Sequence, residues 1–170
     1  IAVHPSDMCV ALAALDAQVL VEGPKGKRQI KFTDFHRLPG NTPEKDNTLD
    51  AKELITSVEI PDHNFTKNVH YLKVRDRTSY AFALVSVAVA LDIKNNAIND
   101  VRLAMGGVAH KPWRLTEAEE FLKGKTVSEE TFRQAANLAM KGARGYGDND
   151  FKITLGANAI TEALTIAASK

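Results

Sequence analysis

An alternation of large apolar and small side chains in the middle of the chain constrains its fold more than any other feature. From residue 86 to residue 93, every second side chain is large and apolar, and most of those between are small. This period of two predicts a β-strand with Val87, Val89, Leu91 and Ile93 on one face and Ser86, Ala88 and Ala90 on the other. Because Asn95-Asn96 can adopt left-handed backbone angles, we expect residues 98–105 to pair back as a hairpin. The small-residue face predicts either a close neighbour or a half-exposed sheet.

Composition and charge exclude several classes of function. The 22 basic and 21 acidic residues are well mixed, so there is no basic stripe and we expect no nucleic-acid partner. No apolar run reaches the ~20 residues of a membrane-spanning helix, and we expect no membrane association. The single Cys9 can neither form a disulfide within the chain nor hold an iron–sulfur cluster alone. The five His residues show no ligand spacing, so we predict no metal site and no catalytic residue.

The flanking segments predict further strands and helices. Ser6 can cap a helix over residues 6–16, and a hairpin follows, with strands at 17–21 and 28–32. Two more strands are expected at 53–60, ended by Pro61, and at 69–74. In the last third, Thr116-Glu-Ala-Glu119 reads as a capping box, and Ser128 and Asp150 as caps of two more helices. Three helices against three antiparallel strands predict an α+β layer.

Two charged residues allow both a structural and a functional interpretation. Asp7 lies in the first turn of a predicted helix, where the dipole stabilises an acid by roughly 0.3–1 kcal/mol. Its carboxylate could equally accept hydrogen bonds from the hydroxyl groups of a ligand. Lys73 lies on a predicted strand, where a lysine usually points to solvent. From its position alone, Ile55 is a core residue of its strand.

Five short motifs, in order along the chain, resemble one known family. They are His4-Pro-Ser-Asp7, Val58-Glu-Ile-Pro61, Tyr71-Leu-Lys-Val-Arg-Asp-Arg77, Ser86-Val-Ala-Val-Ala-Leu91 and Gly106-Gly-Val-Ala109. Together they resemble the FAD-binding (medium) subunit of the molybdenum hydroxylases, which include xanthine, aldehyde and carbon monoxide dehydrogenases. The resemblance runs from His4 to about Ala168. Tyr80-Ala-Phe-Ala83 departs from the common Asp-Phe-Ala, and the glycine-rich pyrophosphate-binding segments of the family are absent.

The resemblance implies an α+β fold in two parts. Residues 1–61 would be the latter portion of a two-part FAD-binding domain, so the chain is expected to begin partway through that domain. Residues 66–170 would form a C-terminal domain like that of the CO dehydrogenase flavoprotein. In the family this second domain has a three-stranded antiparallel sheet packed on a three-helix bundle.

The resemblance also implies a cofactor and its contacts. Asp7 would approach the ribityl chain and ring of FAD, Lys73 would lie beside the isoalloxazine, and Ile55 would pack on the flavin, with Leu54 as the register alternative. A fixed ammonium near the ring stabilises the reduced form and raises its potential. The chain would be an electron-transfer subunit of a xanthine or aldehyde dehydrogenase type of oxidoreductase. Its partners would be a large subunit with the molybdenum cofactor and a small subunit with iron–sulfur clusters.

Other interpretations stay open. Without the phosphate-binding loops, the chain could be a folded fragment that binds FAD weakly or not at all. It could also be a structural module that docks onto partner subunits through the small-residue face of its sheet. The resemblance favours a cytoplasmic location, or a periplasmic one if a partner subunit carries the export signal.

Overall fold

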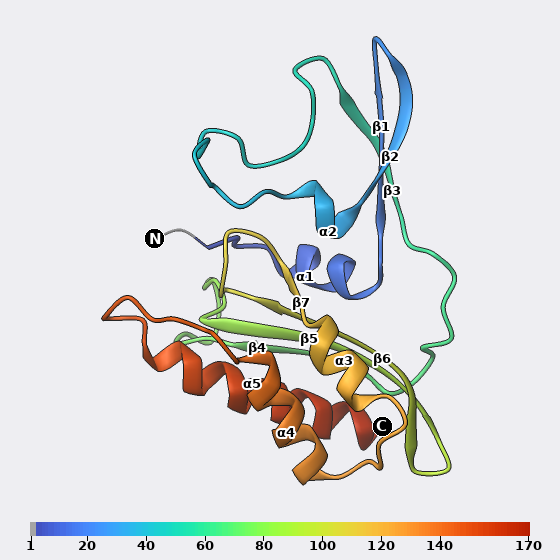
Figure 1. The fold of residues 1–170 in the computed structure, drawn as a ribbon, viewed down its shortest axis with the longest axis vertical. Helices are drawn as coiled ribbons and strands as arrows, with labels where there is room; N and C mark the ends of the chain where they lie inside the picture. The colour runs from blue at the N-terminus through green and yellow to red at the C-terminus, as the bar shows by residue number, and fades with distance from the viewer. Residues whose placement is uncertain (1–2) are drawn as a thin grey trace.

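The computed structural model describes residues 3–170 and contains two antiparallel sheets with a helix between them (Figure 1). The first sheet has the strand order β2-β1-β3. It comprises β1 (Gln18–Gly23), β2 (Gly26–Lys31) and β3 (Leu54–Glu59), and the short helix α2 (Phe32–Phe35) follows β2. Gly26 has a φ of 101°, which the tight turn between β1 and β2 requires. These elements confirm the predicted hairpin and the strand that Pro61 ends.

The second sheet has the strand order β4-β5-β6-β7. It contains three long strands, β4 (Val69–Val74), β5 (Val85–Lys94) and β6 (Ala97–Gly106), and the two-residue edge strand β7 (Trp113–Arg114), which was not predicted. Asn95 and Asn96 have φ values of 51° and 60°, so the predicted hairpin is confirmed with its turn chemistry.

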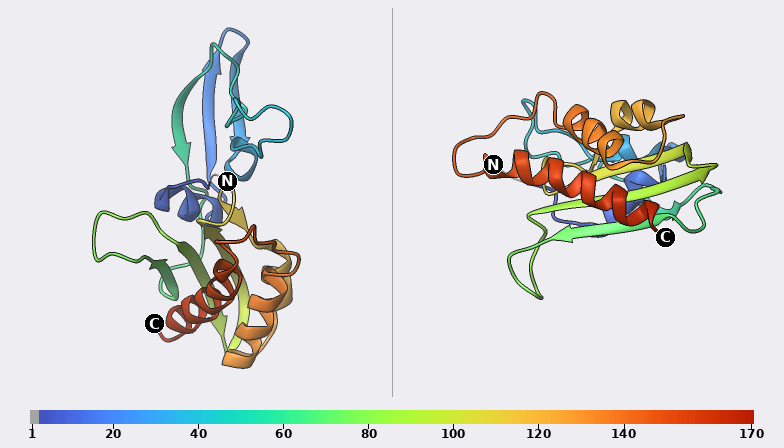
Figure 2. Two further views of the ribbon diagram at one scale, coloured as in Figure 1. Left: turned by 90° about the vertical axis from the view of Figure 1, so that its left-hand side faces the viewer. Right: turned by 90° about the horizontal axis from the view of Figure 1, so that it is seen from below.

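Three helices cover one face of the second sheet. They are α3 (Thr116–Leu122), α4 (Glu129–Ala139) and α5 (Phe151–Ala168), and Figure 2 shows α5 lying across the strands. The large side chains of the alternating segment point into this layer and are buried there with the apolar residues of α5, among them Ile160 and Leu164. Burial of a side chain of this size contributes about 1.5–3 kcal/mol. The predicted α+β layer is therefore present, and none of the helices among residues 3–170 is long and apolar enough to cross a membrane.

The helix α1 (Asp7–Ala14) covers the opposite face of this sheet and lies between the two sheets (Figure 1). The small side chains Ser86, Ala88 and Ala90 are at most 5% exposed, so of the two predicted alternatives the close neighbour is the one found. Val10 of α1 comes so close to β6 that a Cβ atom on Gly106 would lie 2.5 Å from its Cγ2. The small residues are needed because a helix backbone packs directly on them.

Of the four predicted helix caps, two differ in the structure, and Ser6 caps α1 as predicted. Ser128 caps α4, since its Oγ accepts from Thr131 N at 3.1 Å. Asp150 occupies the expected position before α5, but its side chain accepts from Gly147 N instead of capping the helix. The capping box at Thr116 is wrong: α3 has no side-chain cap, and the Glu119 carboxylate accepts from Leu103 N at 2.6 Å.

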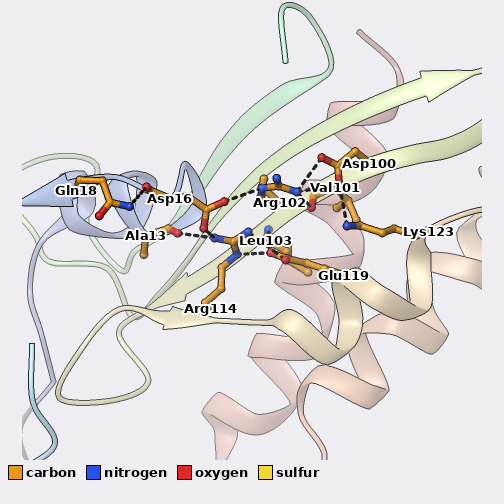
Figure 3. A network of polar contacts seen from close by, with 10 residues as sticks. All are labelled: Ala13, Asp16, Gln18, Asp100, Val101, Arg102, Leu103, Arg114, Glu119 and Lys123. Carbon is orange, nitrogen blue, oxygen red and sulfur yellow. Dashed lines mark hydrogen bonds and ion pairs between the residues drawn. The ribbon is translucent and has the colours of Figure 1, made fainter. Parts of the chain in front are cut away.

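Glu119 belongs instead to a polar network between α1 and the second sheet (Figure 3). Arg114 pairs with the buried Glu119 carboxylate and with Asp16, which follows α1. Arg102 of β6 also donates to Asp16, at 3.0 Å, and it pairs with Asp100. The network therefore fixes the end of α1 on the sheet.

The division into parts at 1–61 and 66–170 stays a prediction. By its place in the sequence α1 belongs to the first part, but it packs on the sheet of the second part.

Candidate functional site

Asp7 and Lys73 form an ion pair at the start of α1. The Lys73 Nζ lies 2.8 Å from Asp7 Oδ2, and the Tyr71 hydroxyl donates to Asp7 Oδ1 at 3.1 Å. Ser6 caps α1 by accepting from Cys9 N, which places Asp7 in the first helical turn, and Lys73 and Tyr71 share one face of β4. The Asp7 and Lys73 side chains are 47% and 25% exposed, so the pair is open to solvent on one side.

Burial holds Tyr71 in its neutral form. It raises the pKa of the Tyr71 phenol to about 12, and the nearby Asp7 charge acts in the same direction. A phenol with this pKa donates a hydrogen bond at all physiological pH values. Asp7 is therefore held by one neutral donor and one cation, which fixes its carboxylate orientation.

The ion pair lines a cavity of ≈ 510 Å³. The far wall is the loop between β4 and β5, from which Tyr80 and Phe82 contribute aromatic side chains that are 95% and 74% exposed. Tyr80 has a φ of 52°, an uncommon angle for an aromatic residue. Cavities of about 300–1,000 Å³ with apolar walls and a few placed polar groups are typical of small-molecule sites.

Ile55 lies apart from this cavity. It is on β3 in the first sheet, is 48% exposed, and is not among the residues that line the cavity. Leu54 and Val58 on the same edge strand, and Ile60 just after its end, are also exposed apolar side chains. The structure thus brings together two of the three predicted binding residues and places the third on a separate surface.

The structure also brings together residues that their spacing in the sequence did not reveal. His4, Cys9 and His36 each offer a ligand atom, and these atoms lie within 4.8 Å of one another. His36 is 32 residues from His4 along the chain, so no local motif could indicate the cluster. Tyr80 and Phe82, which line the cavity of the ion pair, were likewise not predicted as site residues.

Two family comparisons cover nearly the whole chain. Residues 70–166, more than half of the sequence, match the CO dehydrogenase flavoprotein C-terminal domain, and residues 1–63 match the FAD binding domain in molybdopterin dehydrogenase. The chain belongs to the CO dehydrogenase flavoprotein family. The predicted resemblance to the FAD-binding subunits of molybdenum hydroxylases is confirmed.

Curated members of this flavoprotein family include oxidoreductase subunits that are similar over most of the chain. The aldehyde oxidoreductase FAD-binding subunit PaoB of Escherichia coli (strain K12) is 40% identical over 100% of this chain and 50% of its own length. The glyceraldehyde dehydrogenase medium chain of Sulfolobus acidocaldarius is 36% identical over 78% of this chain and 44% of its own length. The chain therefore spans about half the length of the curated relatives it matches.

Solved structures of two oxidoreductases have the same fold as this chain. Quinoline 2-oxidoreductase from Pseudomonas putida 86 superposes with a TM-score of 0.82 at 25% identity, over 97% of this chain and 56% of that chain. Carbon monoxide dehydrogenase from Hydrogenophaga pseudoflava gives a TM-score of 0.83 at 23% identity, over 96% of this chain and 59% of that chain. The α+β fold class predicted from the sequence is thereby confirmed.

The residues around the cavity fit part of a flavin. A flavin ring has apolar faces and a polar edge, and the cavity offers aromatic walls and one fixed ion pair. Its volume suits the ring system and part of the ribityl chain. The glycines beside it do not form a phosphate cradle, because a Cβ on Gly107 would meet the Leu84 carbonyl oxygen at 2.7 Å, so its space is filled by the chain itself.

Proposed function

We propose that this chain is part of the FAD-binding electron-transfer subunit of a molybdenum-containing oxidoreductase of the xanthine or aldehyde dehydrogenase type. One observation carries the proposal: Lys73 Nζ and Asp7 Oδ2 lie 2.8 Å apart on the wall of a cavity. The chain that forms this cavity belongs to a flavoprotein family. When bound, FAD supplies the electron-carrying chemistry, and the protein positions the ring and sets its potential.

Each residue of the site has a proposed role. The Asp7 carboxylate accepts hydrogen bonds from ribityl hydroxyl groups, and it keeps the Lys73 ammonium in place by their ion pair. Lys73 provides a positive charge close to the ring, which favours added electrons. Tyr80 and Phe82 offer exposed aromatic surfaces that the ring would cover. Ile55 is proposed to cover the flavin from β3, on the strength of the family resemblance.

The partners follow from the same proposal. Electrons would come from a large subunit that carries the molybdenum cofactor, pass through iron–sulfur clusters on a small subunit, and leave FAD for an acceptor. One thiolate cannot hold a cluster, so the iron–sulfur clusters of this proposal would lie outside these 170 residues.

A flavin titration of the 170-residue chain tests the proposal. Riboflavin should bind saturably, as measured by the quenching of its fluorescence. AMP should not compete, because the cavity accepts the flavin end of FAD and not the adenine end. Lys73→Met and Asp7→Asn should each weaken binding by about tenfold, or about 1.4 kcal/mol. Lys94→Met, at a 68% exposed lysine on β5, is the matched control and should bind like the original chain. Binding that does not saturate, or that Lys73→Met leaves unchanged, would contradict the proposal.

The second candidate is a docking fragment that does not hold FAD by itself. The exposed apolar side chains along β3 support it, since edge strands with such a surface are usually covered by another chain or segment. The small-residue face first considered for docking is excluded, because α1 occupies it. A folded chain with no flavin binding at any concentration would favour this candidate.

A further inference from the structure

A second cluster of reactive side chains lies beside α1, and its His4 also lines the cavity of the ion pair. His4 precedes α1, Cys9 belongs to its first turns, and His36 follows α2. One ring nitrogen of each histidine and the Cys9 Sγ lie within 4.8 Å of one another, and the two imidazole centroids are 4.3 Å apart. The flavin proposal assigns no role to any of these three side chains.

Both histidines present a buried nitrogen without a hydrogen-bond partner among residues 3–170. These atoms are His4 Nε2 and His36 Nε2. An unpaired buried polar atom is costly, and native proteins rarely keep two side by side without a purpose. The environment favours neutral rings: burial lowers the pKa of His36 to about 4, assisted by the nearby His4 and Lys111, and burial also lowers the pKa of His4. A neutral imidazole keeps the lone pair that binds a metal ion.

We propose that His4, Cys9 and His36 bind a single divalent metal ion of the zinc class, with a fourth coordination position left open. Two imidazoles and one thiolate are a ligand set that zinc accepts in tetrahedral geometry. Zinc–sulfur and zinc–nitrogen bonds of about 2.3 and 2.0 Å place the ligand atoms roughly 3.3–3.6 Å apart. The present separations, all within 4.8 Å, need a closure of about 1 Å, which side-chain rotation can supply.

Neighbouring groups agree with a cation at this position. The Asp46 carboxylate acts on both histidines in the direction that favours positive charge. Phe32 and Phe35 pack edge-on against the His36 ring, with centroids 5.4 and 5.0 Å away, and limit the orientations that it can take. The Lys111 ammonium opposes a cation, but it donates to the Thr33 carbonyl oxygen at 2.9 Å. The bound ion would tie the segment before α1 to the chain after α2.

Cobalt(II) is the probe that tests this site, because it replaces zinc and absorbs visible light. Titration of the full 170-residue chain should give the intense d–d bands of a tetrahedral ion and a thiolate charge-transfer band, at one ion per chain, and Zn²⁺ should displace both. Cys9 is the only cysteine in the sequence, so the charge-transfer band reports on it alone. Cys9→Ser should abolish that band, and His36→Gln should weaken binding by about tenfold or more. The matched control is His63→Gln, at an exposed histidine away from the cluster.

X-ray absorption of the zinc-loaded original chain provides a measurement that needs no variant. One sulfur and two imidazole ligands in the zinc shell would support the site. A shell of nitrogen and oxygen only, a cobalt spectrum that stays octahedral, or the same affinity in Cys9→Ser would overturn it. Since riboflavin binding is a separate readout, failure here leaves the flavin proposal standing, and the reverse also holds.

Discussion

Arg114 Nη1 donates to Asp16 Oδ1 at 2.6 Å, and this bond fixes the end of α1 to the edge strand β7. The same nitrogen donates to the Ala13 carbonyl oxygen at 2.8 Å, while the rest of the guanidinium pairs with Glu119. Both the Arg114 and Glu119 side chains are at most 10% exposed. One arginine therefore holds a helix end, a strand and the start of α3 together (Figure 3).

Arg114→Met is expected to destabilise the chain strongly. It leaves the Glu119 carboxylate buried with only the Leu103 N–H, and an uncompensated buried charge costs about 3–5 kcal/mol. Urea unfolding followed by circular dichroism measures the loss. Adding Glu119→Gln should recover part of the lost stability, because that change removes the unpaired buried carboxylate. Arg133→Met, at an exposed helix pair with Glu129, should cost about 0.5 kcal/mol or less; equal losses at both arginines would contradict the argument.

Gly106→Ala should separate α1 from the sheet. The new methyl group would lie 2.5 Å from both Val10 Cγ2 and Ser86 Oγ, and such overpacking costs about 1–3 kcal/mol. The cost should fall in a Val10→Ala background, which removes one of these two clashes. A double-mutant cycle of unfolding free energies checks this, and strict additivity of the two changes would show that the helix does not press on Gly106.

Asn68→Ala should loosen the end of α5. The buried Asn68 amide donates to the Ala167 carbonyl oxygen at 2.9 Å, one of the carbonyls that a helix end leaves without a partner. Loss of this donor should cost about 1–3 kcal/mol. Hydrogen exchange should become faster in the last turn of α5 before other helices respond. The exposed Asn64→Ala is the control, and similar effects from both changes would remove the capping role.

The Glu53–Arg28 pair should make stability depend on acid pH. The pKa of Glu53 is lowered from 4.5 to about 2. The bidentate hydrogen bonds from Arg28 are the largest cause, and the hydrogen bond from the Asp50 N–H is the second. The folded state therefore binds this proton less readily than the unfolded state. The stabilisation is fully present above pH 4.5 and is lost as the pH falls toward 2.

Glu53→Gln tests that window. The difference in unfolding free energy between the original chain and the variant should shrink as the pH falls from 4.5 to 2. Arg28→Gln removes the other partner and should flatten the same part of the curve. A constant difference across this range would mean that the pair contributes nothing through its charge.

The sequence by itself determined the local elements, because period, turn residues and caps act between near neighbours. The alternation at Val87 to Ile93, the Asn95-Asn96 turn and the Ser128 cap specified their strand, hairpin and helix without help from distant residues. The motifs around Asp7 and Lys73 also pointed to the family, and the two residues meet in one cavity.

Only the tertiary structure decided which partners the polar side chains found. Glu119 has the sequence context of a capping box, yet it faces Leu103 and Arg114, because a buried arginine binds a carboxylate more strongly than a helix end does. The burial of Ala88 under α1 and the meeting of His4, Cys9 and His36 likewise depend on packing between distant segments. Spacing along a chain carries no information about such contacts, since they form only when separate elements bury their apolar faces together.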